Sequence, residues 1–493
     1  GELTNGIKYY YQIRKRSGYN ATYSVWSEVM EVMPGTREYM KKKSSTNGFE
    51  ASIAESQTGS LPLRFSPDST YGFPFIENWQ DSSETFVRKG LGKFAQKMKQ
   101  KNGSLCIAFL GGSITRAHDQ YRQQTLNFIQ SMNPSLKITG VNAGVSGTGT
   151  DLGACRLQDQ VLKYKPDLLF VEFAVNGGDF AAMEGIVRHV KISSPSTAIC
   201  FIYTISGEQH KAYTAGRIPE YISGLEKIAA HYQLPSIHMG LRAAQLESLG
   251  KLVWKSKEDV EGKTVFSRDG VHPTRQGGDL YAAAIARGLN KILGGNANYN
   301  VAIPTALYGN EWENANMIDP AQYASLTGQW QQVTTADNKD LSTFASWFPY
   351  ILKTETPNSS LCFRFSGTGF GFFDIGGPEV GQVSITVDGV PASLVRTSGS
   401  RSWVLNNDPA ITGKNTLNRF NEYCFGRYRG QFELMRVKEG VHKVCYVLSN
   451  EKIDKSTFVS KTTDEDFRNN PLKYEKQTFY LGKILLLGKP LNK

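Results

Sequence analysis

The spacing of apolar positions changes twice along this chain of 493 residues. From about residue 86 to 293, short apolar runs alternate with segments of helical spacing. The apolar runs cover 105–110, 136–141, 167–173, 198–203 and 234–237, and the clearest helical segments cover 121–132, 152–164, 218–231 and 277–293. This pattern predicts an α/β fold in which helices cover both faces of a parallel sheet. Because ligands bind such sheets beyond the carboxyl ends of the strands, we expect the chemistry in the loops there.

Helical spacing nearly vanishes from about residue 300 to the end of the chain. Strand-like runs cover 360–365, 369–375, 382–387, 431–437, 442–448 and 478–487, and Gly, Asp and Asn separate them. This pattern predicts a separate all-β domain, a β-sandwich or jelly roll. Gly367, Gly369 and Gly371 lie among these strands and indicate tight strand packing rather than a phosphate-binding loop.

The N-terminal part of the chain does not complete a domain by its own pattern. Residues 9–14 and 26–32 alternate on either side of a polar turn at 17–20, which predicts a β-hairpin. Residues 36–83 are rich in Gly, Ser, Thr, Asn and Pro, so we interpret them as a linker that packs over a neighbouring domain. The chain begins with Gly1 and shows no signal peptide, which suggests a processed or truncated chain.

Composition excludes several classes of protein. A hydrophobic content of 40% excludes wholesale disorder. The apolar runs are too short to cross a bilayer, so we expect no membrane insertion. The 56 Lys and Arg exceed the 45 Asp and Glu, which gives a net charge of +11. These basic residues are spread along the chain without a nucleic-acid-binding motif, so we interpret them as a solubilising surface and expect no nucleic acid partner.

The six cysteines do not form a metal-binding pattern. Cys106 and Cys200 lie in apolar runs and are expected to be buried. One disulfide can form among Cys362, Cys424 and Cys445, but the sequence does not assign its pairing. Without the spacing of a zinc site, and without a nucleotide-binding glycine pattern, we expect neither a metal nor a cofactor.

Polar residues follow the predicted strands of the α/β region. Gly111 and Gly112 allow a tight turn that places Ser113 at the start of a helix, which suits a nucleophile or a helix cap. A second loop, at 142–150, contains three glycines, and a third carries Asn176 at the end of a strand. These loops are the candidate positions for a reactive site.

One of the seven histidines stands in a setting that favours catalysis. His272 follows Asp269 by three residues in a loop framed by Gly and Pro. The carboxylate can accept a hydrogen bond from one ring nitrogen and leave the other as a base. His118 lies five residues after Ser113 and is a weaker candidate, and the other histidines lie in helical, strand-like or polar stretches without a carboxylate and a turn in the right relation.

Four short motifs, taken together in chain order, resemble a known superfamily. Gly-Gly-Ser, Asn-x-Gly-x-x-Gly, Val-Asn-Gly and Asp-x-x-His-Pro are similar to the four blocks of the SGNH (GDSL-type) hydrolases, in the subgroup that begins Gly-Gly-Ser-Ile-Thr. The resemblance implies a flavodoxin-like three-layer α/β fold. It also implies Ser113 as nucleophile, His272 as general base and Asp269 as its orienting partner. The oxyanion donors would be the N–H groups of Ser113 and Gly147 and the side chain of Asn176.

Two positions depart from the superfamily pattern. Gly112 stands where many members have Asp, although the Gly-Gly-Ser subgroup shares this glycine. Gly177 stands where most members have Asp after the Asn. From the second departure we expect a looser loop around Asn176 and a lower or altered activity.

Weaker resemblances complete the domain organisation. The β region resembles the galactose-binding-like accessory sandwiches of carbohydrate esterases, and the N-terminal hairpin resembles the last two strands of a fibronectin type III domain. We therefore expect a partial fibronectin-like hairpin at 1–35, a linker at 36–83, an SGNH hydrolase domain at 84–295 and an accessory β-sandwich at 300–493. Whether that sandwich binds glycan is left open.

The resemblance implies a secreted or periplasmic serine esterase that removes acyl groups, O-acetyl above all, from an acylated glycan. Two alternatives remain at this point. One is an esterase or thioesterase for lipids, which would prefer long acyl chains. The other is a non-catalytic carbohydrate-binding protein on a degenerate hydrolase scaffold. The sequence does not indicate the oligomeric state.

Overall fold

The computed structural model describes residues 63–68, 74–117, 120–294, 302–345, 347–396, 402–408, 410–458 and 464–492, together with the backbone of four short N-terminal strands. Of these, β1 (Tyr9–Tyr11) pairs antiparallel with β4 (Met30–Val32), and β2 (Arg16–Ser17) pairs with β3 (Thr22–Tyr23). These pairings agree with the predicted hairpin, while its likeness to a fibronectin domain stays a prediction.

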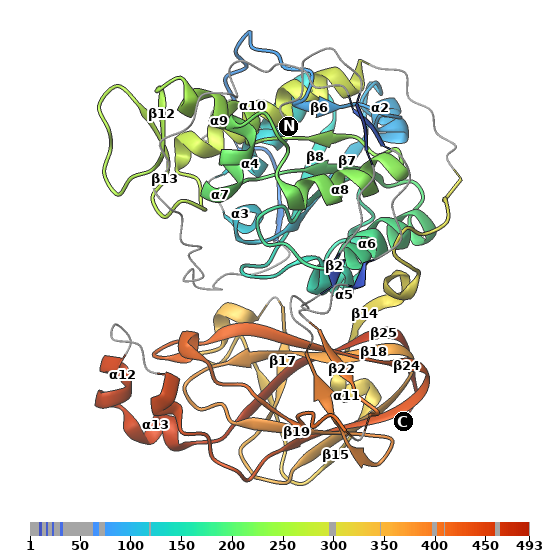
Figure 1. Ribbon diagram of the computed structural model, residues 1–493, viewed down its shortest axis with the longest axis vertical. Helices are drawn as coiled ribbons and strands as arrows, with labels where there is room; N and C mark the ends of the chain where they lie inside the picture. Colours follow the sequence, from blue (N-terminus) through green and yellow to red (C-terminus); the bar gives the residue numbers. More distant parts are fainter. Residues whose placement is uncertain are drawn as a thin grey trace.

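A seven-stranded sheet forms the centre of the α/β part (Figure 1). Its strands, in spatial order, are β5 (Leu63–Phe65), β8 (Lys137–Gly144), β7 (Ser104–Gly111), β9 (Leu168–Glu172), β10 (Ala198–Ile202), β11 (Ser236–Ile237) and β6 (Thr85–Phe86). The five central strands are parallel, and the two edge strands are antiparallel to their neighbours. The parallel strands follow the order 2-1-3-4-5 of flavodoxin-like folds, which confirms the predicted fold class.

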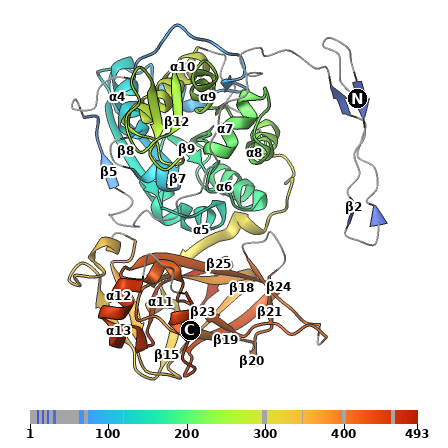
Figure 2. The ribbon, with the colours of Figure 1, turned by 60° about the vertical axis from the view of Figure 1, so that its left-hand side comes forward.

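Helices cover both faces of this sheet. They are α2 (Gly92–Lys97), α3 (Ser113–Arg116), α4 (Tyr121–Met132), α5 (Thr150–Gln160), α6 (Phe180–Ser193), α7 (Gly207–Thr214), α8 (Glu220–His231), α9 (Leu241–Ser248) and α10 (Arg275–Leu293), with a 3-10 turn η1 (Leu162–Tyr164). Helices α4 and α10 pack together on one side, and α5, α6 and α8 on the other (Figure 2). A further parallel pair, β12 (Leu252–Lys255) and β13 (Thr264–Ser267), leads into α10.

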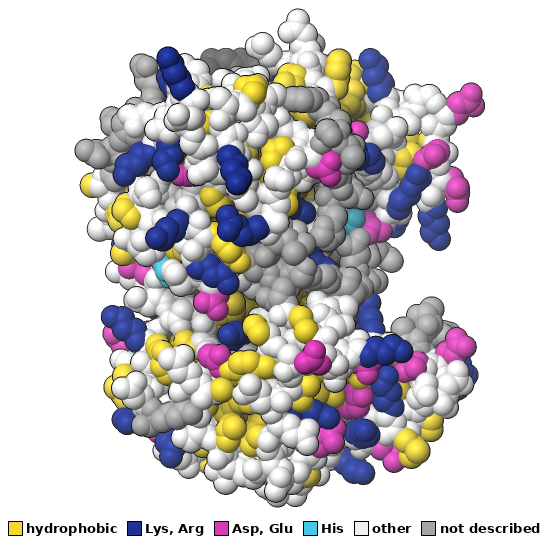
Figure 3. All heavy atoms as spheres, turned by 180° about the vertical axis from the view of Figure 1, so that it is seen from behind, with side chains coloured by type: hydrophobic (Ala, Val, Ile, Leu, Met, Phe, Trp, Pro, Cys, Tyr) yellow, Lys and Arg dark blue, Asp and Glu magenta, His cyan; other side chains and the backbone are white. Residues whose placement is uncertain are grey.

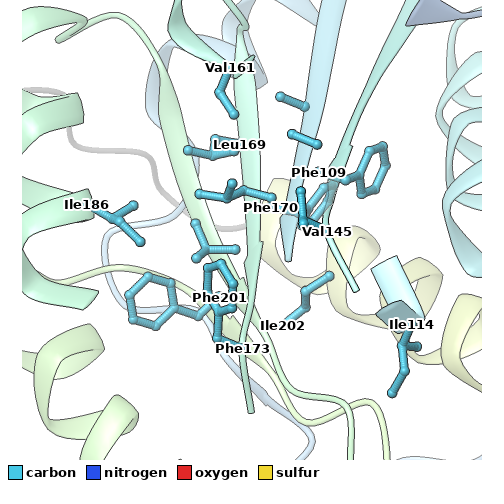
Figure 4. Close-up of a cluster of buried hydrophobic side chains, with 14 of the residues drawn as sticks. Phe109, Ile114, Val145, Val161, Leu169, Phe170, Phe173, Ile186, Phe201 and Ile202 are labelled. Atoms are coloured by element: carbon cyan, nitrogen blue, oxygen red, sulfur yellow. The ribbon is translucent and has the colours of Figure 1, made fainter. Parts of the chain in front are cut away.

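The core of the α/β part is built from apolar side chains of the central strands and the helices facing them (Figure 4). The rings of Phe109 on β7 and Phe170 on β9 stack with their centroids 5.2 Å apart. On the opposite face, Phe173 packs against Gly153 of α5, where a Cβ would lie 2.6 Å from Phe173 Cζ. Strands buried on both faces explain why their sequence reads as continuous apolar runs.

Part of the predicted linker belongs to the sheet. Strand β5 pairs with β8, and the ring of Phe65 lies 6.4 Å from that of Phe109 and beneath the Arg122 guanidinium. Trp79, further along the same segment, lies between Arg242 and Arg287, each 5.0 Å from its ring. The weak periodicity of residues 36–83 concealed this because a three-residue strand is too short to show a period.

The C-terminal part is a large antiparallel β structure, as predicted. Its strands are β14 (Ala315–Ile318), β15 (Ala324–Thr327), β16 (Gln331–Thr334), β17 (Tyr350–Thr354), β18 (Ser360–Gly376), β19 (Gln382–Val387), β20 (Val390–Pro391), β21 (Leu394–Val395), β22 (Trp403–Leu405), β23 (Thr416–Asn418), β24 (Arg429–Leu448) and β25 (Phe479–Leu491). Short helices join them: η2 (Glu311–Asn314), α11 (Pro320–Tyr323), η3 (Ser342–Phe344), η4 (Glu422–Cys424), η5 (Lys455–Phe458), α12 (Asp464–Asn469) and α13 (Pro471–Glu475).

Strands β18 and β24 are each longer than the two predicted runs that they contain. The register of β18 shifts between Gly367 and Gly369, so the strand continues through the glycines. A Cβ at Gly367 would lie 2.1 Å from a backbone oxygen of β25, which confirms tight strand packing there. Cys362 and Cys445 face each other across β18 and β24 and form a disulfide, while Cys424 is buried as a free thiol.

The two parts of the molecule share a packed interface below α5 and α6 (Figure 1). Trp312 of η2 is 1% exposed and lies against Gly185 of α6, where a Cβ would come within 2.2 Å of the Trp312 Cβ. Arg188 pairs with Glu313, and the Arg436 guanidinium lies 5.6 Å above the Trp312 ring. One hydrophobic cluster therefore extends from the α/β core into the β domain.

The basic residues are distributed over the surface. On the face shown in Figure 3, Lys and Arg side chains are scattered among acidic and uncharged ones rather than gathered into one patch. This distribution agrees with a solubilising role for the excess of positive charge. Within the described residues, no helix has the length and apolar character needed to cross a membrane.

Candidate active site

Three predicted residues meet in one hydrogen-bonded chain at the carboxyl end of the sheet. Ser113 directly follows β7 and opens α3, and its Oγ lies 2.7 Å from His272 Nε2. On the other side of the ring, His272 Nδ1 lies 2.7 Å from Asp269 Oδ2. With Nδ1–H donating to the carboxylate, Nε2 is left to accept the serine proton. The fold thus brings together a serine and a histidine that are 159 residues apart in the chain.

The Asp269 carboxylate is fixed in its charged form. Its Oδ1 accepts the N–H groups of Val271 at 2.8 Å and His272 at 2.9 Å. Burial alone would raise the pKa of Asp269, but the hydrogen bonds from the His272 ring and from these N–H groups hold it well below its ordinary value. A permanently ionised carboxylate at this position orients the imidazole and stabilises its protonated form.

The loop that carries Asp269 and His272 is braced from below by a residue that the sequence did not reveal. Trp254 of β12 donates its indole N–H to the carbonyl of Gly270 at 2.9 Å, and the Gly207 N–H donates to the same carbonyl at 3.1 Å. Gly270 has φ +93°, a conformation that favours glycine. Nothing in the local sequence marks Trp254, because its partner lies 16 residues away.

Gly112 is explained by the side chain of Asn176. A Cβ at position 112 would lie 1.8 Å from Asn176 Oδ1, so any larger residue would displace the amide. In this chain the space next to the nucleophile is therefore occupied by Asn176. This contact also brings two of the predicted residues, Ser113 and Asn176, to neighbouring loops at the ends of β7 and β9.

The three predicted oxyanion donors stand at the ends of three adjacent strands, β8, β7 and β9. The Ser113 N–H lies in the first turn of α3, where helix N–H groups have no partner within the helix. Gly147 lies on the exposed turn after β8 with φ +71°, and Val145 joins that loop to the nucleophile loop through its N–H to Gly111 O at 3.0 Å. The order of the strands, with β7 in the centre, places the three loops that carry these groups next to one another.

Hydrogen bonds hold the loop that carries Asn176, and the expectation that Gly177 makes this loop looser than in other superfamily members stays a prediction. Gly177 has φ +69°, which suits glycine, and its carbonyl accepts the Thr150 N–H at 3.2 Å. Tyr221 donates its hydroxyl to the Gly178 carbonyl at 3.2 Å. These contacts come from the starts of α5 and α8. They hold the loop at the position where most superfamily members have Asp after the Asn.

Glu172 is a buried carboxylate directly beneath the site, at the end of β9. It is 0% exposed and accepts a hydrogen bond from Thr115 Oγ1 at 2.8 Å, from the Thr204 hydroxyl, and from the N–H groups of Gly112 and Ala174. Burial raises the pKa of Glu172, and these hydrogen bonds oppose that effect. The carboxylate joins the loops after β7, β9 and β10. A charged residue at the end of an apolar run was the available sequence signal.

Arg156 of α5 is a second buried charged residue near the site, and it contacts carbonyl groups at the ends of β7 and β8. Its guanidinium, which is fully buried, donates to the carbonyls of Ala143 at 2.5 Å and Gly111 at 2.9 Å. Burial lowers the pKa of Arg156 to about 9. The ends of β8 and β7 are thus joined through their carbonyl groups, while Glu172 binds the N–H groups of the loops.

Two histidines that the sequence set aside do have carboxylate partners. His210 Nε2 lies 2.9 Å from Glu247, and His442 Nδ1 lies 2.8 Å from Asp388. These contacts join distant parts of the chain, so local sequence could not show them. His442 Nε2 is occupied by the Lys438 carbonyl at 2.9 Å, which leaves it no free nitrogen to act as a base. His118 lies outside the described residues. In the described part of the chain, no cluster of three His, Cys, Asp or Glu could hold a metal ion.

Comparison with known proteins finds similarity in structure rather than in sequence. No protein-family model matches the chain, and no curated protein matches it. A two-domain esterase (CEX) active on acetylated mannans, co-crystallised with mannopentaose, aligns with a TM-score of 0.59 and 20% identity over 84% of this chain and 99% of its own. The same esterase without that ligand aligns with a TM-score of 0.59 and 20% identity over 83% and 98%.

A smaller solved structure aligns with part of this chain. Axe2, an acetylxylan esterase from Geobacillus stearothermophilus, aligns with 21% identity and a TM-score of 0.30 over 38% of this chain and 96% of its own. The likeness to the two-domain esterase establishes that this chain has the same two-part fold. The predicted architecture, a flavodoxin-like α/β fold joined to an all-β domain, is thereby confirmed.

Proposed function

We propose that this protein is a serine esterase that removes O-acetyl groups from a polysaccharide or oligosaccharide through an acyl intermediate on Ser113. The hydrogen-bonded chain of Ser113, His272 and Asp269 at the carboxyl end of the sheet carries the proposal. A serine hydroxyl becomes a nucleophile at neutral pH only with an adjacent base, and this arrangement supplies one. The shared fold of an esterase active on acetylated mannans supports an acetylated glycan as substrate.

The proposed reaction has two stages. In the first, Ser113 Oγ attacks the ester carbonyl carbon while His272 Nε2 accepts the serine proton. The oxygen that becomes negative is stabilised by the N–H groups of Ser113 and Gly147 and by the Asn176 amide, and each such donor lowers the barrier by about 3–4 kcal/mol. The bond to the sugar oxygen then breaks, and His272 protonates that oxygen, so a free sugar hydroxyl and an acetylated Ser113 result.

In the second stage a water molecule attacks the acetylated serine. His272 accepts a proton from this water, and a second tetrahedral intermediate forms in the same oxyanion site. Its collapse breaks the bond to Ser113 Oγ, releases acetate and returns the proton to the serine. Asp269 keeps its charge throughout and holds the imidazole in orientation, which its lowered pKa supports.

Replacing the nucleophile tests this proposal. We expect Ser113→Ala to lower the rate of acetate release from p-nitrophenyl acetate and from acetylated mannan by at least about a thousandfold. The variant should unfold at the wild-type temperature, because Ser113 is a small side chain whose hydroxyl contacts the His272 ring. Labelling of the wild type, but not the variant, by a fluorophosphonate would identify the same serine. Full activity in Ser113→Ala would exclude the proposal.

A series of p-nitrophenyl esters distinguishes this function from lipid hydrolysis. We expect turnover to fall as the acyl chain lengthens from acetyl to octanoyl, whereas a lipid esterase would show the opposite order. Glycan binding without turnover of any ester would indicate a carbohydrate-binding protein instead.

We also propose secretion or a periplasmic location, because the disulfide between Cys362 and Cys445 is typical of oxidising compartments.

A further inference from the structure

A groove of about 690 Å³ opens between the starts of α6, α7 and α8. Phe180, Ile218 and Tyr221 form its apolar wall, and Glu208, Gln209 and Lys227 contribute polar groups. Helix α6 follows β9 and α7 follows β10, so both begin at the carboxyl end of the sheet (Figure 2). Helix α8 follows α7 and leads back to β11, so it begins at the same end. The groove therefore opens on the same end of the sheet as Ser113.

The aromatic wall of the groove is held rigidly. The rings of Phe180 and Tyr221 stack with centroids 4.9 Å apart and an angle of 20° between their planes. Tyr308 stacks on Phe180 as well, at 5.9 Å. The Phe180 ring rests on Gly224 of α8, where a Cβ would lie 2.2 Å from Phe180 Cζ. A wall that does not need to be ordered on binding loses little entropy when a ligand contacts it.

Hydrogen bonds connect the groove to two loops of the candidate active site, the one that carries Asn176 and the one that carries Asp269 and His272. Tyr221 donates to the Gly178 carbonyl at 3.2 Å, and Gln209 Nε2 donates to the Ala174 carbonyl at 2.7 Å, so both contact the loop that carries Asn176. The first residue of α7 donates to the loop between Asp269 and His272. Phe180 is four residues beyond Asn176, and four residues of chain span at most about 14 Å. The groove is thus a direct extension of the site.

We infer that this groove binds sugar rings of the acetylated glycan next to the one whose ester is cleaved. This inference rests on the proposed function. A pyranose ring has an apolar face of C–H groups and a polar rim of hydroxyls. The C–H face fits the apolar wall that Tyr221, Phe180 and Ile218 form, and the hydroxyls fit the polar side chains of Glu208, Gln209 and Lys227. Lys211 donates to both oxygens of Glu208, at 2.8 Å and 2.9 Å, and each carboxylate oxygen has a second lone pair that can accept a sugar hydroxyl.

The test compares a polymeric and a minimal substrate. The measured quantity is the ratio of kcat/KM for acetylated mannopentaose to kcat/KM for p-nitrophenyl acetate, which has no second sugar to bind. We expect Tyr221→Ala to lower this ratio about tenfold, the effect of one aromatic contact. Glu208→Gln, a substitution at an exposed position that should not affect folding, is expected to lower the same ratio severalfold.

Two further variants separate ring stacking from support of the loop. Tyr221→Phe keeps the ring and removes the hydroxyl that contacts Gly178, so we expect the wild-type ratio. Tyr164→Ala changes a half-buried tyrosine at the opposite end of the sheet and should leave both rates unchanged. A wild-type ratio in Tyr221→Ala, or equal losses in Tyr221→Phe and Tyr221→Ala, would overturn the inference. Either result leaves the esterase proposal standing, because that depends on Ser113→Ala with p-nitrophenyl acetate alone.

Discussion

At the scale of single residues, the site depends on buried polar groups as much as on the three that form the hydrogen-bonded chain. Glu172 receives four hydrogen bonds, and all four partners are hydroxyl or N–H groups that can donate. A carboxylate offers enough lone pairs for all of them, whereas an amide would direct an NH2 group at some of the donors. Glu172 is therefore a positioning residue, which acts on Ser113 and Asn176 through their loops.

Glu172→Gln tests this role. We expect kcat for p-nitrophenyl acetate to fall about a hundredfold with little change in KM, because misplaced oxyanion donors weaken only the transition state. A steady-state comparison of kcat and KM, with circular dichroism as a check on folding, measures this. Thr197→Val removes a buried hydroxyl that contacts Pro166 O at 2.6 Å, away from the site, and serves as the control. Equal kcat in wild type and Glu172→Gln would contradict the role.

The effect of Glu172→Gln on stability should depend on pH, and the pKa of Glu172 sets the direction. The folded-state pKa of Glu172 is raised above its ordinary value, chiefly by burial. The folded protein then binds this proton more tightly than the unfolded chain does, so the stability that Glu172 contributes is greatest at low pH and decreases as the pH rises through the folded-state pKa. Denaturant titrations at several pH values should show the wild type losing its advantage over Glu172→Gln toward neutral pH.

At the scale of helices and strands, the sequence predicted those elements whose burial follows a simple pattern. The parallel strands were found because both of their faces are buried, which gives continuous apolar runs, and Tyr121–Met132 because its apolar residues recur with helical spacing. Helix α6 follows the run at 167–173, where a helical segment was expected, but it was not among the clearest predicted helices. Long strands were divided at glycines, which break the pattern but, as at Gly367, not the strand.

Some residues of the candidate site could likewise be predicted from the sequence, and others could not. Ser113, Asn176 and the pair Asp269 and His272 are visible in the sequence because each belongs to a short local motif. Glu172 and Trp254 reach partners on other strands, and no local spacing records those contacts. Prediction from one sequence therefore named the groups that the structure brings together in the candidate site and missed the residues that hold their loops in position.

The pairing of β18 with β24 gives a prediction at this scale. Their disulfide closes a loop with a sequence separation of 83 residues, so removing it enlarges the unfolded ensemble. We expect the double variant Cys362→Ser with Cys445→Ser to lose about 2–4 kcal/mol of stability. Thermal unfolding should show a lower Tm, with turnover of p-nitrophenyl acetate kept at room temperature. Wild-type protein treated with a reductant should show the same decrease, and an unchanged Tm in both would contradict the prediction.

At the scale of the whole molecule, the two domains form one packed unit rather than two bodies on a flexible linker. Helix α6 carries the Asn176 loop before its first turn and Gly185 in its middle, and Gly185 lies against Trp312 (Figure 1). The same helix thus touches the β domain and positions a predicted oxyanion donor. Loss of this contact should lower the cooperativity of unfolding and alter the position of the Asn176 loop in the candidate site.

Trp312→Ala tests this coupling. Removing a fully buried indole from the interface is expected to cost about 3–5 kcal/mol. We expect calorimetry to resolve the single unfolding transition of the wild type into two, because the domains would then unfold separately. Val441→Ala, at a position 56% exposed on β24, removes apolar area from the same domain outside the interface and should keep one transition near the wild-type Tm. One transition at the wild-type temperature in Trp312→Ala would mean that the interface does not couple the domains.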